Sequence, residues 1–317
     1  MNILVTGCAG FIGSSLTQRL LNEDYRVIGI DNFDPFYPKA LKEKNLKALY
    51  SHPCFTFYEA DITEPECFSI IKDNINCVVH LAAKAGVRPS IDFPSDYIKN
   101  NIFGTQNLLN WMVLKGIHKY IFASSSSVYG NSLTVPFTES QDVNETISPY
   151  AFTKKSGEIL NYTYHHLYNI DTVNLRLFTV YGPKQRPDLA IRKFTDLIYS
   201  DKPVTLYGDG TSSRDYTFID DIVEGIISSV KLVFKSNDFF EIINLGSNHP
   251  ITLIEMVNVI SDTIGKKPEI IFNKMQPGDV SRTFADITKA GRLLSYSPRT
   301  PFKEGIRKFV EWYYAQN

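Results

Sequence analysis

Three glycines follow the first predicted strand and constrain the fold more than any other feature of the chain. The apolar run Ile3–Thr6 leads into TGCAGFIG, where Gly7, Gly10 and Gly13 precede an amphipathic helical pattern at Phe11–Leu21. Glycines at these positions allow a tight turn and let a pyrophosphate approach the backbone at the helix N-terminus. The segment therefore predicts the first βα unit of a dinucleotide-binding domain.

Short β-branched runs alternate with helical patterns through the first half of the chain. The expected strands are Ile3–Thr6, Arg26–Ile30, Phe55–Glu59, Cys77–Leu81, Lys119–Ser124 and Thr172–Leu177. The expected helices are Phe11–Leu21, Glu66–Ile71, Ser95–Lys115 and Pro149–Tyr168. Strands separated by helices indicate βαβ units, and near-continuous apolar strands such as CVVHLA fit a sheet covered on both faces. We therefore predict an α/β fold with a Rossmann-type, doubly wound parallel sheet.

The rhythm of the sequence changes after Gly182. A helix is expected at Ala190–Tyr199, a strand at Val204–Tyr207 and a helix at Asp221–Val230, followed by PGD and SPRTP turns. We predict a dinucleotide-binding domain over residues 1–180 and a smaller α/β substrate domain over residues 181–317. Some elements at about 214–245 are expected to return to the first sheet.

Composition narrows the class of protein. The net charge of −1 gives no electrostatic reason to bind nucleic acid or an anionic membrane, and no apolar run reaches the length of a membrane span. The cysteines are Cys8, Cys54, Cys67 and Cys77, with no CxxC pair and no metal-ligand spacing. Met1 leads directly into NILVTG without a basic signal region. We expect a reduced cytoplasmic protein without a metal site.

The ends of the next strands indicate which dinucleotide is bound. Asp31 ends the second strand, where an acidic residue accepts hydrogen bonds from an adenosine ribose. Its carboxylate would repel a 2′-phosphate, and the following NFDPFYP offers no arginine, so NAD is favoured over NADP. Asp61 and Ile62 either contact the adenine or, for the aspartate, cap a helix. His80 is expected to be a core histidine with satisfied hydrogen bonds.

The segment SPYAFTKKSGE places Tyr150 and Lys154 on one helix face at i and i+4. Ser148 can cap this helix and Pro149 suits its first position. A tyrosine with a pKa of about 10 is a poor base at neutral pH, but a neighbouring ammonium and an oxidised nicotinamide would both lower that pKa. The pair therefore predicts an acid/base tyrosine, with a surface pair that has no chemistry as the alternative.

Together these motifs resemble one enzyme family. TGCAGFIG, Asp31, HLAA, the serine-rich strand end FASSSSVYG, Tyr150-x-x-x-Lys154 and RLFTVYGP are similar to the extended short-chain dehydrogenase/reductases, specifically their nucleotide-sugar epimerases. The likeness covers nearly the whole chain. It implies tightly held NAD, a UDP-sugar substrate bound by the C-terminal domain, and a homodimer packed through the helices at Ser95–Lys115 and Pro149–Tyr168.

The resemblance also implies roles for individual residues. Ser125, Tyr150 and Lys154 match the family's catalytic triad, in which the serine binds the reacting sugar oxygen, the tyrosine exchanges its proton and the lysine holds the nicotinamide ribose. The implied cofactor contacts are Gly7, Gly10, Phe11, Ile12, Gly13, Asp31, Asn32, Asp61, Ile62, Leu81, Ala82, Ala83, Asn100, Tyr150, Lys154 and Phe178. The implied substrate contacts are Arg88, Ser126, Ser127, Thr179, Arg186, Arg192, Arg214 and Arg282.

Two stretches of the sequence indicate which sugar the UDP carries. HLAAKAGVRPS and LFTVYGPKQRPDLAIRKF resemble UDP-glucuronate 4-epimerases more closely than UDP-glucose 4-epimerases, although Lys84 departs from the pattern. Related dehydratases carry Asp-Glu where this chain has Ser126-Ser127, and related decarboxylases carry Glu at Ser127. We expect C4 epimerisation of UDP-glucuronate through a 4-keto intermediate. The alternatives are a 4-epimerase of a neutral or N-acetylated UDP-sugar, a decarboxylase, a 4,6-dehydratase, and a non-catalytic NAD-binding regulator.

Overall fold

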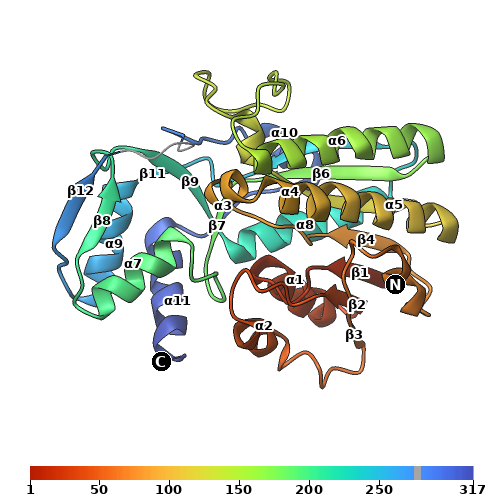
Figure 1. Cartoon of the computed structure of the whole chain (residues 1–317), viewed down its shortest axis with the longest axis horizontal. Coiled ribbons are helices and arrows are strands. Elements are labelled where there is room, and N and C mark those ends of the chain that lie inside the picture. Colours follow the sequence, from red (N-terminus) through yellow and green to blue (C-terminus); the bar gives the residue numbers. More distant parts are fainter. Residues whose placement is uncertain (275–279, 317) are drawn as a thin grey trace.

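The computed structural model describes residues 1–274 and 280–316 as one large and one small region (Figure 1). The large region is built around a parallel sheet, and the small one carries α7, α9, β8 and β12. The expected PGD turn falls outside the described residues. The prediction of an α/β fold with a parallel sheet is confirmed.

The main sheet has seven strands in the order β10-β6-β5-β4-β1-β2-β3, all paired in parallel. Its strands are β1 (Asn2–Thr6), β2 (Arg26–Asp31), β3 (Phe55–Glu59), β4 (Cys77–His80), β5 (Lys119–Ser125), β6 (Asp171–Leu177) and β10 (Phe240–Leu245). The strand order reverses between β1 and β4, which is where doubly wound sheets bind their ligands.

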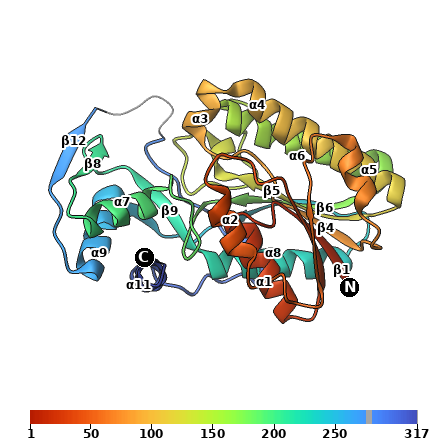
Figure 2. The ribbon, with the colours of Figure 1, turned by 60° about the horizontal axis from the view of Figure 1, so that its bottom comes forward.

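Helices cover both faces of this sheet (Figure 2). They are α1 (Phe11–Asn22), α2 (Lys39–Leu46), α3 (Val87–Asp92), α4 (Pro94–Ile98), α5 (Gly104–Lys115), α6 (Pro149–Tyr168) and α8 (Ile219–Phe234). The pleat of β1 separates two apolar cores, because successive side chains point to opposite faces. Ile3 and Val5 join the core under α1 and α8, whereas Leu4 joins Leu108 in the core under α5.

Two helix predictions were wrong in detail, and two helices were missed. The single helix expected at Ser95–Lys115 is divided into α4, a π-helical turn η2 (Lys99–Phe103) and α5. The Asn101 side chain explains the interruption: it accepts a hydrogen bond from Lys84 N and donates to Lys84 O and to the Thr153 hydroxyl. The segment expected as a helix at Glu66–Ile71 is the 3₁₀ turn η1 (Pro65–Ile70), and α2 and α3 were not expected at all.

The remaining elements form the small region or lie between it and the main sheet. They are β7 (Thr179–Tyr181), α7 (Ala190–Tyr199), β8 (Val204–Tyr207), β9 (Ser213–Phe218), β11 (Pro250–Thr252), α9 (Leu253–Ile264), β12 (Ile270–Asn273), α10 (Thr288–Leu294) and α11 (Phe302–Tyr314), with a serine-rich 3₁₀ turn η3 (Ser126–Tyr129) after β5. Of these, α10 packs against α8 and β10, and η3 packs against α6. β11, β9 and β7 form one small sheet and β12 and β8 another. Within the stretch 214–245, α8 and β10 return to the main sheet, whereas β9 does not.

Three chemical features complete the description. All four cysteines are free thiols. Over residues 1–274 and 280–316, no His, Cys, Asp and Glu side chains gather as a metal site would require. No helix in that part of the chain has the length and apolar character needed to cross a membrane.

Candidate active site

In the glycine turn after β1, Gly7 and Gly13 are packed so closely against backbone that neither position has room for a side chain. Gly7 has a φ of +71°, and a Cβ there would lie 2.8 Å from Ala82 N. A Cβ on Gly13 would collide with the Gly7 backbone. Gly10 is the N-cap of α1 and supplies no capping side chain, so amides of the first turn stay available to a ligand. This geometry fits a dinucleotide pyrophosphate at a helix N-terminus.

One cavity runs from this turn along the carboxyl ends of the parallel strands. It is lined by every expected cofactor residue except Asp61, and by the expected catalytic residue Ser125. Of the expected substrate residues, Ser127, Thr179 and Arg186 line it, whereas Ser126, Arg88, Arg192, Arg214 and Arg282 do not. Residues far apart in the sequence are thus gathered at one sheet edge, as expected for this fold.

Asp31 is buried at the cofactor end of the cavity. Its carboxylate accepts hydrogen bonds from Ala9 N at 3.1 Å and Phe33 N at 2.8 Å, and Lys42 Nζ lies 3.6 Å away. Lys42, which comes from α2, was not predicted to lie here. Each carboxylate oxygen has a second acceptor position, so Asp31 can still accept from ribose hydroxyls.

Asp61 lies behind the cavity wall rather than in it. Its carboxylate accepts hydrogen bonds from Asn32 Nδ2 at 2.9 Å and from Thr63 N at 2.8 Å, which fixes the adjoining ends of β2 and β3. Asn32 and Ile62 themselves line the cavity. The adenine contact expected of Asp61 stays a prediction, and the structure gives this residue a bracing role.

His80 has a hydrogen-bond partner for each ring nitrogen, Thr6 at 2.7 Å and Thr105 at 3.0 Å. Burial lowers the pKa of His80 to about 3, with a smaller contribution from the charge of Lys154. The imidazole is therefore neutral at physiological pH, and His80 is a core histidine with satisfied hydrogen bonds, as expected.

The expected catalytic residues meet where α6 begins. Ser148 caps the helix by accepting from Ala151 N at 3.2 Å, and Pro149 occupies its first position. Lys154 Nζ donates to the carbonyl oxygen of Ala123 at 2.7 Å. The Ser125 hydroxyl accepts from Ser127 N and donates to Ser127 Oγ, both at 3.1 Å. The end of β5 and the first turns of α6 therefore form one catalytic wall.

Burial displaces both catalytic pKa values from their ordinary range. It lowers the pKa of Lys154 to about 7. Burial also raises the pKa of Tyr150, while a hydrogen bond with Ser125 and the charge of Arg186 act against it. Our sequence interpretation gave the lowering effect to Lys154. In the structure, the Lys154 amine donates to a carbonyl oxygen, and Arg186 is the cation whose charge lowers the pKa of the Tyr150 phenol.

The substrate end of the cavity carries one well-anchored cation. Arg186 makes a bidentate contact with Asp188, at 3.0 and 2.8 Å, and lies over the ring of Phe36. Thr179, at the start of β7, lines the cavity together with Arg186. Lys84 pairs with Asp34 at 3.0 Å on the cavity wall. Sequence reasoning flagged Lys84 only as a departure, and gave no partner for it.

The other expected arginines lie around the cavity. Arg88 stacks over Tyr207 across the two regions, and Arg192 stacks over Trp312. Arg214 donates to the carbonyl of Ser213, and Arg282 belongs to the segment that pairs with Ser213. Arg214 and Arg282 thus come from adjoining segments, and their contact with substrate stays a prediction.

Comparison with known proteins places this arrangement among enzymes of nucleotide sugars. The family model described as GDP-mannose 4,6 dehydratase matches residues 4–309. A UDP-glucuronate 4-epimerase of Thermodesulfobacterium geofontis is 43% identical over 312 residues, covering 98% of this chain and 95% of the relative.

Two solved structures are similar over the full chain. A UDP-glucuronic acid 4-epimerase from Bacillus cereus, in complex with UDP-glucuronic acid and NAD, has a TM-score of 0.93 at 39% identity and covers 100% of both chains. A UDP-N-acetylglucosamine 4-epimerase from Methanobrevibacter ruminantium has a TM-score of 0.90 at 32% identity, covering 100% of this chain and 99% of that one.

Proposed function

The chain belongs to the GDP-mannose 4,6 dehydratase family of extended short-chain dehydrogenase/reductases, and we propose that it is the NAD-dependent enzyme that interconverts UDP-glucuronate and UDP-galacturonate. The similarity to the Bacillus cereus enzyme over the whole chain supports this substrate. We assign the cofactor to residues 1–180 and the nucleotide sugar to residues 181–317 together with the end of β5.

The observation that carries the proposal is the pair Ser126-Ser127, which stands where related dehydratases have an acid and a base. The only carboxylates that line the described cavity are Asp31 and Asp34, both from the end of β2 and the loop after it, at the cofactor end. A dehydratase must protonate a leaving hydroxyl and remove a carbon-bound proton. No group near Tyr150 on the lining can do both, so the reaction stops at inversion.

Tyr150 takes the proton of the sugar 4-hydroxyl and later returns it, while Ser125 holds that oxygen. Bound NAD supplies reversible hydride acceptance at C4 of the sugar. Gly7 and Gly13 would leave space for its pyrophosphate, and Asp31 would accept hydrogen bonds from its adenosine ribose. Lys154, which donates to the Ala123 carbonyl, would hold the nicotinamide ribose. Inversion requires the 4-keto sugar to present its other face before the hydride returns.

The uronate carboxylate needs a site that binds it without cleaving it. A 4-keto uronate is a β-keto acid, and it loses CO₂ when its carboxylate turns perpendicular to the carbonyl. Ser127 and Thr179 offer hydroxyl donors on the cavity wall and Arg186 offers a positive charge. Hydrogen bonds from these groups keep the carboxylate near the plane in which its C–C bond resists cleavage.

NMR of purified protein incubated with UDP-glucuronate tests the proposal directly. We expect UDP-galacturonate as the product, with little 4-keto pentose and no 6-deoxy sugar. A UDP-pentose or 4-keto pentose as the main product would make the protein a decarboxylase. Faster turnover of UDP-N-acetylglucosamine or UDP-glucose in the same panel would favour the alternative that the Methanobrevibacter relative represents. Bound NAD without turnover of any UDP-sugar would indicate a non-catalytic regulator.

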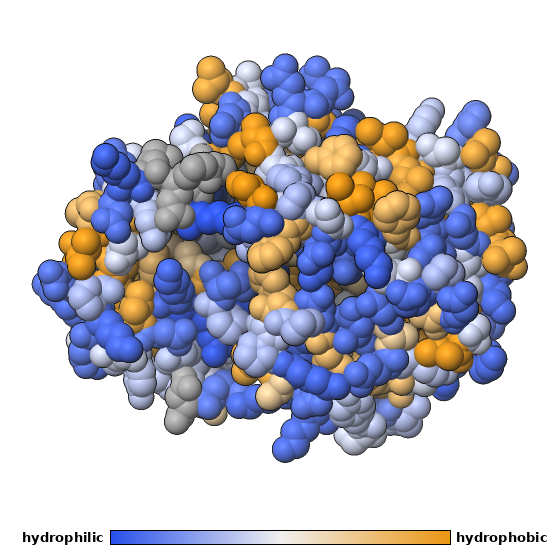
Figure 3. Space-filling model, in the orientation of Figure 1, coloured by the Kyte–Doolittle hydropathy of each residue, from blue (hydrophilic) through white to orange (hydrophobic). Residues whose placement is uncertain are grey.

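We also propose that the enzyme is a homodimer of the cytoplasm. Apolar side chains gather over the upper right of the molecule in Figure 3, where Figure 1 places α4, α5 and α6. Phe152, Ile159 and Tyr162 of α6 and Phe103 of η2 are all exposed. Two copies of these helices would cover each other's apolar side chains. The free thiols are typical of a reducing compartment.

A further inference from the structure

The first serine of the strand end contacts a residue that the catalytic scheme does not use. Tyr150, Lys154 and Glu158 follow one another at four-residue intervals on α6, so they share one helix face. Each of the three contacts one of three adjacent residues of β5, Ala123 to Ser125. Tyr150 pairs with the Ser125 hydroxyl, Lys154 with the Ala123 carbonyl at 2.7 Å, and Glu158 with the Ser124 hydroxyl, also at 2.7 Å.

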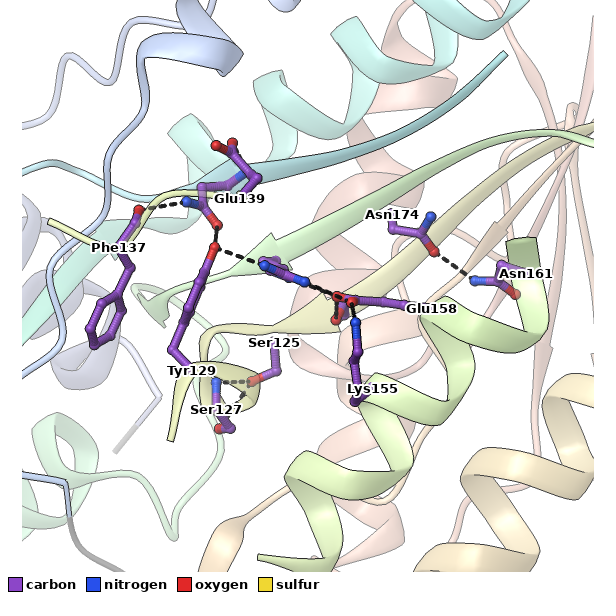
Figure 4. Close-up of polar contacts among 12 residues, drawn as sticks. Ser125, Ser127, Tyr129, Phe137, Glu139, Lys155, Glu158, Asn161 and Asn174 are labelled. Carbon is purple, nitrogen blue, oxygen red and sulfur yellow. Dashed lines mark hydrogen bonds and ion pairs between the residues drawn. The ribbon is translucent and has the colours of Figure 1, made fainter. Parts of the chain in front are cut away.

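Glu158 is held by a buried arginine from the neighbouring strand (Figure 4). Arg176 Nε and NH2 each donate to the Glu158 carboxylate at 2.8 Å, and both side chains are 1% exposed. Ser124 and Arg176 are register partners on β5 and β6, so the carboxylate bridges two strands. Burial raises the pKa of Glu158, but Arg176 and the Ser124 hydroxyl outweigh that effect and hold it below its usual value.

The hydrogen bonds of Arg176 also extend toward the substrate side of the molecule. Arg176 NH1 donates to Tyr129 Oη at 3.0 Å, and this phenol donates to Asn244 Oδ1 at 2.7 Å. The amide of Asn244 in turn donates to the carbonyls of Phe137 and Asp286. One chain of hydrogen bonds thus joins α6, η3, β10 and the segment that follows Arg282 (Figure 4).

A buried ion pair rarely adds stability over apolar side chains of the same volume, because both charges lose their hydration. Directional contacts can instead select one geometry. We propose that Glu158, with Arg176 and Ser124, is the positioning residue that sets α6 along β5 so that Tyr150 and Ser125 meet at the sugar oxygen. This inference rests on the proposed function only in that Tyr150 and Ser125 act on the substrate.

Two variants test it at the contact itself. Ser124→Ala removes the hydroxyl that joins β5 to Glu158 and leaves the ion pair intact. Glu158→Gln keeps the shape but removes the charge opposite Arg176. We expect kcat to fall by about 10-fold in the first and about 10²-fold in the second, since small misplacement of reacting groups costs this much. The KM for UDP-glucuronate should change far less, because Glu158 does not line the cavity and the Ser124 hydroxyl is bonded to Glu158.

The pH profile separates positioning from a general loss of stability. The groups that face the Tyr150 phenol are Ser125 from β5, Lys154 on α6, Arg186 from the loop before α7 and Tyr97 from α4. A weaker contact with Ser125 leaves the pKa of Tyr150 higher. The acid limb of the kcat profile should therefore move to higher pH in both variants.

Asn161→Ala is the matched control. Asn161 Nδ2 donates to Asn174 Oδ1 at 2.7 Å, a fully buried contact between α6 and β6 about one turn farther from the site (Figure 4). Its loss should lower the melting temperature but leave kcat and the pH profile unchanged. If Ser124→Ala behaves like this control in an active enzyme, the inference is overturned, and this variant decides the matter even where Glu158→Gln does not fold. An inactive wild type would instead contradict the proposed function.

Discussion

Single residues in this cavity owe their chemistry to exclusion from water. Tyr150 and Lys154 are both buried, and burial moves their pKa values in opposite directions, raising that of the phenol and lowering that of the ammonium to about 7. A phenol and an ammonium in water differ little in pKa and rarely exchange protons with a sugar hydroxyl. Here Ser125 and Arg186 favour the phenolate while burial favours the neutral amine. The environment, more than the residue types, sets the acid/base behaviour of the site.

Tyr150→Phe removes the proposed proton carrier and little else. We expect turnover to fall by about 10²–10⁴-fold, the usual range for loss of a general acid–base group. Calorimetry should find the binding of NAD and of the UDP-sugar largely intact. Tyr168→Phe is a suitable control, because Tyr168 lies exposed at the far end of the same helix. Near-normal epimerisation by the Tyr150 variant would remove this residue from the mechanism.

The pKa of Lys154 predicts how stability depends on pH in the ligand-free protein. Its folded pKa is about 7 and its ordinary value is 10.5, so between these values the unfolded chain binds the extra proton. Raising the pH through that window therefore favours the folded state. Lys154→Met should remove this contribution. Denaturant unfolding at about pH 7 and about pH 9 measures it as a steeper rise of the unfolding free energy in the wild type than in the variant.

Equal pH slopes for the wild type and Lys154→Met would mean that Lys154 keeps an ordinary pKa in the folded protein. Lys115→Met provides the background slope, because Lys115 is an exposed lysine at the end of α5.

Local patterns predicted the chemistry-bearing residues of the site, but not their long-range partners. Tyr150 and Lys154 share a helix face by spacing, and the glycine turn follows directly from the sequence. Lys42 beside Asp31 and Arg176 beside Glu158 were not predicted. These pairs depend on which elements become neighbours in space, and a single sequence carries no signal for that.

At the scale of helices and strands, close contacts between backbone segments position the site as much as side-chain contacts do. The turn between β1 and α1 brings Gly13 against the Gly7 backbone. Gly13→Ala should therefore displace α1, weaken NAD binding and lower the unfolding free energy by about 1–3 kcal/mol, as overpacking does. Calorimetry with NAD and thermal unfolding measure the two effects.

Gly291→Ala is the control for that substitution. Gly291 lies in α10, where a Cβ would meet only Tyr296 O, at an ordinary 3.7 Å. Alanine favours a helix over glycine, so this variant should be neutral or slightly more stable. If both alanine variants bind NAD like the wild type, the glycine turn does not hold the cofactor.

At the scale of elements, strands were predicted more accurately than irregular helices. The six strands expected in the first half were found with boundaries within one residue, because apolar, β-branched runs were bounded by clear turns. The interruption by η2 was not predicted, since it depends on the bonds of Asn101 to Lys84 and Thr153. The helix α2 was not predicted, because its apolar pattern is weak.

At the scale of the whole molecule, several exposed apolar side chains lie where the proposed partner would bind. Ile159 on α6 is 57% exposed, and Ile159→Glu would place a charge in the proposed interface. We expect light scattering to give a dimer for the wild type and a monomer for this variant. Leu133→Glu should keep the wild-type mass, because Leu133 is 95% exposed in the loop between η3 and α6 and belongs to none of the interface helices. A monomeric wild type would contradict the proposed homodimer.

The return of β10 to the main sheet has a consequence for how the protein is made. β10 completes the edge beside β6, and α8 covers the same sheet, yet both are translated long after residue 180. A nascent chain that has just emerged to that point presents an unpaired β6 edge and an uncovered apolar face. Such edges recruit other strands. A fragment ending at residue 180 is therefore expected to aggregate on expression, whereas one ending after β10 should stay dispersed, as sedimentation of the two lysates would reveal.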